Sequence, residues 1–220
     1  MTNLTLIIGN KNYSSWSFRP WILLKQKNIS FKEIRIPLGT PEWAEKIEQY
    51  SPTRKVPVLQ DGNLSVWDSL AICEYLADKF PEKVLWPSAI HDRAVARAIS
   101  AEMHSGFADL RTSMTLNCRA HLPGIGMTRD VAADIRRISQ IWADCRARFG
   151  NRGDFLFGEF SIADAMYAPV ALRFKTYSVT LDTVARAYVD AICQLPATQE
   201  WVAAAHLETE VLPQYEMPSK

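Results

Sequence analysis

The sequence has no apolar run that approaches the roughly 20 residues required by a membrane-spanning helix. Its N-terminal stretch, MTNLTLIIGNKNY, lacks the basic region and the long apolar segment of a secretory signal, so we expect no such signal. Neither sign of charge is in excess, because 25 basic residues face 24 acidic ones. This balance argues against a nucleic acid or a membrane surface as a partner.

Cysteine and histidine are also scarce, and neither shows the spacing of a metal site or a disulfide framework. The cysteines, which lie far apart in the sequence, are Cys73, Cys118, Cys145 and Cys193. The histidines are His91, His104, His121 and His206. We therefore expect reduced thiols packed as small apolar side chains in a cytoplasmic protein, and no bound metal.

The first 80 of the 220 residues alternate short apolar runs with helical patterns. Apolar and β-branched runs predict strands over 4–8, 31–36, 56–60 and 64–67, the last two joined by the turn Asp61-Gly62-Asn63. Helical spacing predicts helices over 15–28, 41–50 and 68–80. The expected order is β-α-β-α-β-β-α.

Strand patterns end near Pro87, and the rest of the chain reads as helix. The helical segments expected there are 89–117, 129–149, 161–177, 183–194 and 197–207. FPEKVLWPS, with two prolines, is the expected linker. The sequence thus predicts an α/β domain over 1–80, a linker over 81–90 and an all-α domain over 91–220.

The stretch NYSSWSFRPW opens the first expected helix and carries several hydroxyl groups. A serine at a helix start can accept a hydrogen bond from an unpaired N–H group, and we expect Ser15 or Ser17 to do so. Pro20 supports a helix start close by. Ser14 then falls just upstream, where its hydroxyl could face a cleft.

Two further stretches combine ordinary structural residues with binding potential. Pro57 opens a strand, where a proline is tolerated, but a cis Val56-Pro57 peptide would direct the polar backbone groups of Val56 toward a ligand. Asp68 and Ser69 are ordinary helix N-caps, yet a helix start also binds carboxylates and an aspartate can hold an ammonium group. Together, a serine hydroxyl, the backbone N–H and C=O groups of Val56, and a helix start beside an aspartate fit a γ-glutamyl-cysteinyl ligand. The helix start and the aspartate would bind the α-carboxylate and the α-ammonium of the γ-glutamyl residue.

These three stretches, in this order and spacing, resemble the cytosolic glutathione transferases over nearly the whole chain. SSWSFRPWILL is similar to the Ser-Ser-Cys-x-x-Arg segment of the zeta class. SPTRKVPVLQDGNLSVWDSLAICEYL resembles the glutathione-binding core, and FLFGEFSIADAMYAPV resembles the capping box of the helical domain. The resemblance implies a thioredoxin-like first domain, glutathione as co-substrate, a small electrophilic second substrate and a homodimer joined through the third helix and the helices after the linker.

The resemblance also assigns roles to residues on the glutathione side. Ser14 matches the catalytic serine whose hydroxyl bonds the glutathione sulfur, and Ser15 can share that role, while Tyr13 is a competitor. By the same resemblance, the backbone of Val56, beside cis-Pro57, would pair with the cysteinyl part of glutathione. The remaining assignments are Asp68 and Ser69 for the γ-glutamyl end, and Lys55, or less favourably Arg54, for the glycyl carboxylate. A hydroxyl donor at the positive end of a helix would lower the thiol pKa by about one to two units.

The second substrate should meet the helical domain. Helical spacing places His104, Phe107, Ala108 and Arg111 on one face of a continuous helix, although a core position is the more ordinary role for Phe107. With Trp16, we take His104, Phe107 and Arg111 as substrate-binding candidates. Residues 38–43, this helix and the C-terminal tail would complete the pocket.

Two departures from the family pattern bear on the reaction. Trp16 stands where the zeta class has a cysteine that assists isomerisation, which argues against maleylacetoacetate isomerisation. Lys55 stands where the family usually has glutamine. In addition, position 14 is a serine and not a cysteine, which argues against thiol-disulfide exchange. The leading hypothesis is a glutathione transferase; a glutathione-dependent isomerase or peroxidase and a non-enzymatic glutathione-binding protein are the alternatives.

Overall fold

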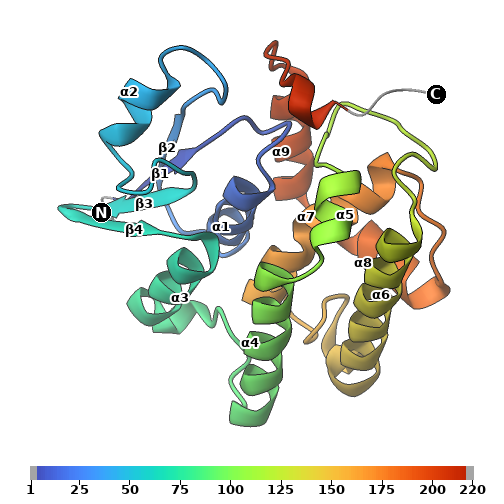
Figure 1. Ribbon diagram of the computed structural model, residues 1–220. Helices are drawn as coiled ribbons and strands as arrows, with labels where there is room; N and C mark the ends of the chain where they lie inside the picture. Colours follow the sequence, from blue (N-terminus) through green and yellow to red (C-terminus); the bar gives the residue numbers. More distant parts are fainter. Residues whose placement is uncertain (1–3, 217–220) are drawn as a thin grey trace.

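A computed structural model describes residues 4–216 and contains a four-stranded sheet in the order β2-β1-β3-β4 (Figure 1). The strands are β1 (Leu4–Ile8), β2 (Lys32–Arg35), β3 (Val58–Asp61) and β4 (Leu64–Trp67). β1 runs parallel to β2 and antiparallel to β3, and β3 and β4 form a hairpin. The pairing of Asp61 with Leu64 leaves Gly62-Asn63 as a two-residue loop, one residue shorter than the predicted turn. Gly62 has φ +59°, which glycine adopts without steric cost.

The central strand β1 is buried on both faces, which explains its uninterrupted apolar sequence LTLII. Leu4, Leu6 and Ile8 belong to the main hydrophobic core. Ile7 points the other way, into a smaller core with Val58 beneath α2. The helices of this half are α1 (Ser15–Gln26), α2 (Trp43–Glu48) and α3 (Ser69–Lys79).

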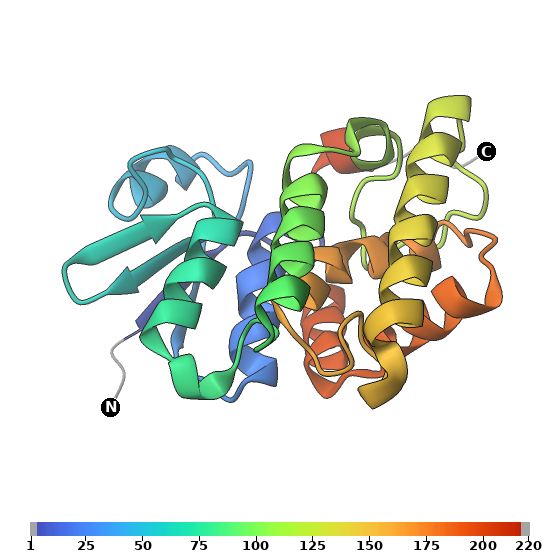
Figure 2. The ribbon, with the colours of Figure 1, turned by 90° about the horizontal axis from the view of Figure 1, so that it is seen from below.

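The chain beyond α3 forms no strand among the described residues (Figure 2). Its elements are a short 3₁₀ turn (Pro81–Lys83), α4 (Ile90–Ser105), α5 (Ala108–Ser113), α6 (Arg129–Phe149), a second 3₁₀ turn (Gly150–Arg152), α7 (Ile162–Thr176), α8 (Thr183–Gln194), α9 (Pro196–His206) and a final 3₁₀ turn (Pro213–Tyr215). The order of elements confirms the predicted fold class, an α/β half followed by an all-α half. The domain boundaries at 81–90 stay a prediction.

The predicted continuous helix over 89–117 is wrong, because it breaks between α4 and α5. Gly106 ends α4 by donating its N–H to the Glu102 carbonyl, and a Cβ on Gly106 would lie 2.8 Å from that oxygen. Phe107 follows in the left-handed region at φ +61°. His104 and Arg111 therefore lie on different helices rather than on one helix face.

Helix α7 lies at the centre of the helical half and packs against α1, α4 and α8. Its N-terminus carries the predicted capping box, in which Ser161 and Asp164 exchange hydrogen bonds. Asp164 is fully buried and also accepts from Leu156 N–H and the Tyr188 hydroxyl. This helix holds the two halves in contact, because α1 of the first half packs along it.

Three further properties concern the described residues as a group. Within residues 4–216, no helix is both long and apolar enough to cross a membrane. The four cysteines are free thiols. No group of three or more potential metal ligands occurs in this part of the chain.

Candidate functional site

A pocket of about 290 Å³ opens where the start of α1 faces α5 and α7. Its lining residues come from both halves of the chain: Tyr13, Ser14, Ser15, Trp16, Leu38, Trp43, Arg54, Lys55, Val56, Arg111, Thr115, Leu116, Arg173 and Tyr215. We refer to it as the cleft. It brings together Ser14, Ser15, Trp16, Lys55, Val56 and Arg111 of the predicted site residues.

Ser14 is the N-cap of α1, which corrects the expectation that Ser15 or Ser17 caps this helix. The Ser14 Oγ accepts from Ser17 N–H at 3.3 Å and donates to Ser17 Oγ at 2.7 Å. Ser17 Oγ in turn accepts from Gly9 N–H at 3.2 Å. The Ser14 side chain is therefore both a structural cap and a lining group of the cleft.

Ser15 occupies the first turn of α1, and its Oγ accepts a hydrogen bond from Arg173 Nη2 at 3.3 Å. Arg173 is 5% exposed and is held by the carbonyl of Met114 at 2.9 Å. The guanidinium fixes the oxygen of Ser15 as an acceptor, which leaves the hydroxyl proton available to a ligand.

Trp16, which lines the cleft, contacts two more arginines. The Arg19 Cζ lies 4.2 Å from the centre of the Trp16 ring and the Arg111 Cζ lies 5.0 Å from it. The ring also meets His104 edge-on, with centroids 5.3 Å apart. Cation–π contacts partly stabilise these guanidinium groups, but they supply no opposite charge.

The arginine cluster, which we define as Arg19, Arg111 and Arg173, has no carboxylate partner among residues 4–216 in any ion pair. Burial, with the charges of Arg111 and Arg173, lowers the pKa of Arg19 to about 9. Burial, with the charge of Arg111, lowers the pKa of Arg173 to about 10. The Nε atoms of Arg19 and Arg111 are buried without a hydrogen-bond partner in the described chain. Uncompensated buried cations favour an anionic ligand.

Arg111 was among the predicted site residues, whereas Arg19 and Arg173 were not. A usable signal was present, since a single charge interrupts an apolar helical stretch at Arg173, in MYAPVALRF. Arg111 is placed by hydrogen bonds from its guanidinium to the carbonyls of Met103 and His104.

Phe107 is 8% exposed, belongs to the main hydrophobic core and does not line the cleft. Its position does not support a contact with substrate.

The Val56-Pro57 peptide is cis, and Val56 lines the cleft. Within residues 4–216, neither the N–H nor the C=O of Val56 has a hydrogen-bond partner. Lys55 belongs to the same segment and has no ion-pair partner in the part of the chain that the structure describes, whereas Arg54 is paired with Glu48. The segment therefore presents a free backbone edge and a free ammonium group.

Asp68 begins α3 with φ +74°, and its carboxylate serves two partners. One oxygen accepts from Leu70 N–H at 2.8 Å, and the other lies 3.1 Å from His104 Nε2. Ser69 is buried, and its Oγ accepts from Arg19 Nη1 at 3.3 Å. Asp68 and Ser69 adjoin the arginine cluster through these contacts, although they do not line the cleft themselves.

The Tyr13 hydroxyl is fully engaged by other parts of the chain. It donates to Glu216 and accepts from Arg119 Nη2 at 2.8 Å and from Leu212 N–H at 3.4 Å. Burial, then the hydrogen bond to Glu216, raises the pKa of Tyr13. These bonds argue against Tyr13 as a donor to a ligand sulfur.

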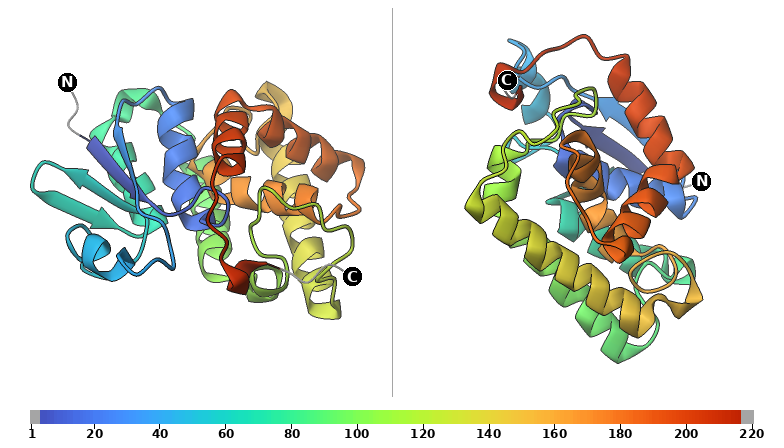
Figure 3. Two further views of the ribbon diagram at one scale, coloured as in Figure 1. Left: turned by 90° about the horizontal axis from the view of Figure 1, so that it is seen from above. Right: turned by 90° about the vertical axis from the view of Figure 1, so that its right-hand side faces the viewer.

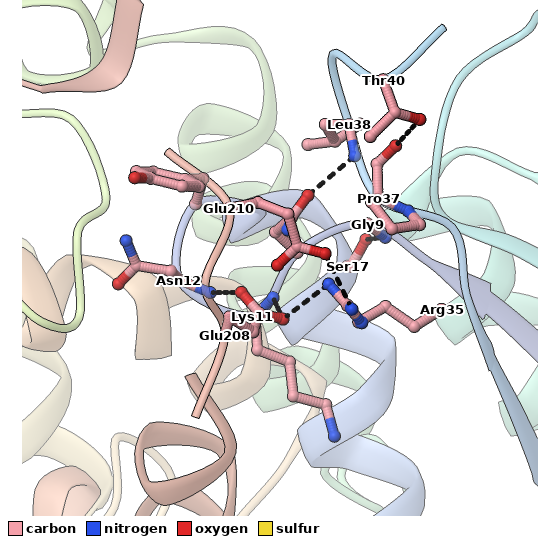
Figure 4. A network of polar contacts seen from close by, with 12 residues as sticks. Gly9, Lys11, Asn12, Ser17, Arg35, Pro37, Leu38, Thr40, Glu208 and Glu210 are labelled. Carbon is pink, nitrogen blue, oxygen red and sulfur yellow. Dashed lines mark hydrogen bonds and ion pairs between the residues drawn. The ribbon is translucent and has the colours of Figure 1, made fainter. Parts of the chain in front are cut away.

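Residues 207–216, which we call the C-terminal segment, run from the end of α9 to the final 3₁₀ turn (Figure 3). Glu208 accepts from Lys11 N–H at 2.7 Å and from Asn12 N–H at 3.0 Å, and Arg35 reaches Glu210 (Figure 4). Tyr215 lines the cleft and stacks on Tyr13 at 5.8 Å. The segment thereby forms one wall of the site.

Two family models match this chain: "Glutathione S-transferase, N-terminal domain" over residues 13–79 and "Glutathione S-transferase, C-terminal domain" over 126–204. Together they take in well over half of the sequence. The chain belongs to the glutathione S-transferase family. This membership confirms the resemblance drawn from the three motifs and makes the protein an enzyme by family.

Individual members of the glutathione S-transferase family agree with the zeta-like motifs. Glutathione S-transferase Z2 of Arabidopsis thaliana is 27% identical over 214 residues, covering 90% of this chain and 93% of that protein. A probable maleylacetoacetate isomerase of Caenorhabditis elegans is 33% identical over 116 residues, which is 53% of this chain and 54% of that one. The chain thus matches about half the length of that isomerase.

The fold agrees with solved structures of the family. The crystal structure of a glutathione transferase homolog from Burkholderia, with bound glutathione, superposes with a TM-score of 0.69 at 22% sequence identity. The alignment covers 93% of this chain and 98% of that one. At this identity the likeness concerns the fold.

Proposed function

We propose that this protein binds glutathione in the cleft and activates its thiol through Ser14 and Ser15 for attack on an electrophile that carries an anionic group. The observation that carries the proposal is that two serine hydroxyls, Arg111 and Arg173 line one pocket, with Arg19 against the Trp16 ring that also lines it. The glutathione-bound Burkholderia relative supports glutathione as the co-substrate.

The sheet half of the chain offers a partner for each part of the tripeptide, with Val56 and Lys55 in the cleft and Asp68 and Ser69 outside its lining. Val56 has a free N–H and C=O, which suit the cysteinyl backbone as an added strand would. Asp68 and Ser69 at the start of α3 suit the γ-glutamyl ammonium and carboxylate. Lys55, whose ammonium has no ion-pair partner in the described chain, suits the glycyl carboxylate.

A hydroxyl donor and the positive end of α1 would favour the thiolate over the thiol. Ser15 has its oxygen held by Arg173 and its proton free, whereas Ser14 would have to turn its proton from Ser17 to the sulfur. The sulfur lone pair then forms the bond to the electrophilic carbon. In a substitution, the leaving group departs with its electron pair.

The pKa of enzyme-bound glutathione, followed by thiolate absorbance in the ultraviolet, tests this activation. We expect Ser14→Ala and Ser15→Ala each to raise that pKa and lower kcat about 10-fold or more, and Tyr13→Phe to leave the pKa unchanged. Thr128→Ala removes the N-cap of α6, outside the cleft, and controls for the capping role of Ser14. An unchanged pKa in both serine variants would rule out serine activation.

The arginine cluster favours an electrophile with a carboxylate. Chloronitrobenzoate and its ethyl ester differ in charge but share the reacting carbon, so their kcat/KM ratio isolates the charge. We expect the wild-type enzyme to prefer the acid and Arg111→Gln to reduce that preference at least 5-fold. Equal use of acid and ester by the wild type would contradict an anionic second substrate.

A glutathione-dependent isomerase is the second candidate. It is favoured by the same arginine cluster and by relatives named maleylacetoacetate isomerase. Because Trp16 occupies the position of the zeta-class cysteine, we consider the isomerase less favoured than the transferase. If the protein isomerised maleylacetone with catalytic glutathione, the isomerase would become the favoured function. No turnover of maleylacetone would rule out the isomerase.

A homodimer and a cytoplasmic location complete the proposal. Leu64 and Trp67 on the edge strand β4, and Ile90 at the start of α4, are 47%, 46% and 68% exposed. Apolar side chains exposed this close to α3 and α4 suit a subunit interface. Light scattering should give twice the chain mass of 24.9 kDa, and Trp67→Ser should shift the equilibrium toward monomer.

A further inference from the structure

His104 lies in the last turn of α4, beside the start of α3 (Figure 2). The sequence predicted that it contacts the second substrate, but it does not line the cleft. Its Nε2 lies 3.1 Å from Asp68 Oδ2, its ring meets Trp16 edge-on, and its carbonyl accepts from Arg111 Nη2 at 3.2 Å. These contacts hold the imidazole against one carboxylate oxygen of Asp68.

The two oxygens of the Asp68 carboxylate differ in what they can still bind. Oδ1 accepts from Leu70 N–H at 2.8 Å and from Ala71 N–H at 3.3 Å. Within residues 4–216, His104 is the one partner of Oδ2. The ammonium group of a ligand would therefore bind at Oδ2, which is the atom that His104 faces.

The surroundings of the imidazole favour its neutral form. Nδ1 is buried and has no hydrogen-bond partner in the described chain, so a proton on Nδ1 would have no acceptor. Burial, with the charges of Arg19 on α1 and Arg111 on α5, lowers the pKa of His104, although Asp68 at the start of α3 raises it. At neutral pH the imidazole is therefore uncharged, and it can donate from Nε2 to Asp68 without cancelling the charge of the carboxylate.

We propose that His104 is a positioning residue that makes glutathione affinity depend on pH, because its protonated form competes with the γ-glutamyl ammonium for Asp68. The uncharged imidazole orients Oδ2 with one hydrogen bond and leaves the negative charge to the ligand. The imidazolium neutralises the carboxylate and repels the ammonium. Affinity should therefore fall as pH falls through the pKa of His104, and bound glutathione should in turn lower that pKa. This inference rests on the proposed glutathione site and adds a control of its occupancy.

Calorimetric titration with S-methylglutathione at pH 7.5 and at pH 5.0 tests the competition, because this ligand has no ionisable thiol. We expect Kd for the wild type to rise about 5-fold at the lower pH. His104→Gln keeps an N–H donor but does not titrate, so its Kd should stay level. His91→Gln, at an exposed position in the first turn of the same helix, is the matched control and should follow the wild type. An S-methyl analogue with glutaryl in place of γ-glutamyl lacks the ammonium and should not bind more weakly at pH 5.0.

The histidine signals in an NMR pH titration measure the same competition from the side of the protein, and His104→Gln identifies the signal of His104. We expect S-methylglutathione to lower the pKa of His104 and to leave that of His91 unchanged. His104→Phe keeps an aromatic ring against Trp16 without a titrating group, and serves with the same level Kd if His104→Gln lowers the melting temperature.

Two kinds of failure are distinguishable. A wild-type Kd that is level with pH, or a pH dependence that persists in the His104 variants, would overturn the competition while glutathione binding stood. No binding of S-methylglutathione at either pH would overturn the proposed function and this inference together.

Discussion

The two sides of the cleft use different physical means. The sheet side offers backbone groups and helix starts, as at Ser14, Val56 and Asp68, each of which has an ordinary structural role as well. The helical side offers Arg111 and Arg173, whose guanidinium groups are bonded to carbonyl and hydroxyl oxygens and, within residues 4–216, form no ion pair with a carboxylate. Burying a charge without a counter-ion is costly, so the helical side carries the clearer indication of a ligand.

The helical side depends on the buried capping box of α7, and breaking it should have the largest effect. Asp164 accepts from Leu156 N–H, from Ser161 N–H and Oγ, and from the Tyr188 hydroxyl. Because Asp164→Ala leaves these donors buried and unpaired, we expect the free energy of unfolding to fall by about 3 kcal/mol or more in urea titrations. Asp182→Ala removes an exposed cap of α8 and should cost only about 1 kcal/mol. Equal losses of unfolding free energy in Asp164→Ala and Asp182→Ala would contradict a special role for the buried capping box.

Removing a charge from the helical side should have the next largest effect. We expect Arg173→Met to lower kcat/KM for chloronitrobenzoate about 100-fold, because it removes a cation and the hydrogen bond that orients Ser15. Arg173→Lys should recover part of the rate, and Arg136→Met on the exposed face of α6 should change nothing. An equal loss with the ethyl ester would mean that Arg173 acts only through Ser15.

Removing a charge from the sheet side should have a smaller effect, confined to glutathione. Asp68→Asn keeps a good N-cap for α3 but loses the charge that would hold the γ-glutamyl ammonium, so we expect KM for glutathione to rise about 10-fold at unchanged kcat. Asp78→Asn, on the exposed end of the same helix, is the control. A fall in kcat with KM unchanged would place Asp68 among the groups that act on the thiol.

The smallest expected effect is a pH dependence of the arginine cluster. Burial lowers the pKa of Arg19 to about 9, so the group is charged below that pH and loses its proton above it. The ratio of kcat/KM for chloronitrobenzoate to that for its ester cancels thiol ionisation, and it should fall a few-fold as pH rises through about 9. A ratio that stays level to pH 10 would show that the cluster keeps its charge.

The fold was largely predictable from the sequence because its signals are local. Apolar and β-branched runs located the strands within one or two residues, and the Ser161-x-x-Asp164 spacing located the start of α7. The break at Gly106-Phe107 was missed because helical spacing continues across it. There, the left-handed backbone of Phe107 and the core contacts of its ring override the pattern.

The candidate site was predictable mainly on its sheet side, since Arg111 was the one cleft-lining arginine of the helical side that the sequence predicted. Motifs carry Val56, Asp68 and the two serines in short segments, so the position of Val56 before a strand and of the others at helix starts could be predicted directly. Arg19 and Arg173 are separated by more than half the chain, and their convergence depends on the packing of α1 against α7. The assignment of the N-cap to Ser14 also depended on which serine oxygen the Ser17 N–H group faces. Residue types alone do not give that orientation.

The C-terminal segment also affects how preparations of this protein should be judged. Leu207 and Val211 are 84% and 61% exposed, so a protease could cut between α9 and the residues that bond Tyr13 and stack on it. A chain clipped there would keep every described helix and strand through α9, along with its circular dichroism, while its cleft stood open on one side. Intact mass should therefore be measured before an inactive batch is attributed to misfolding.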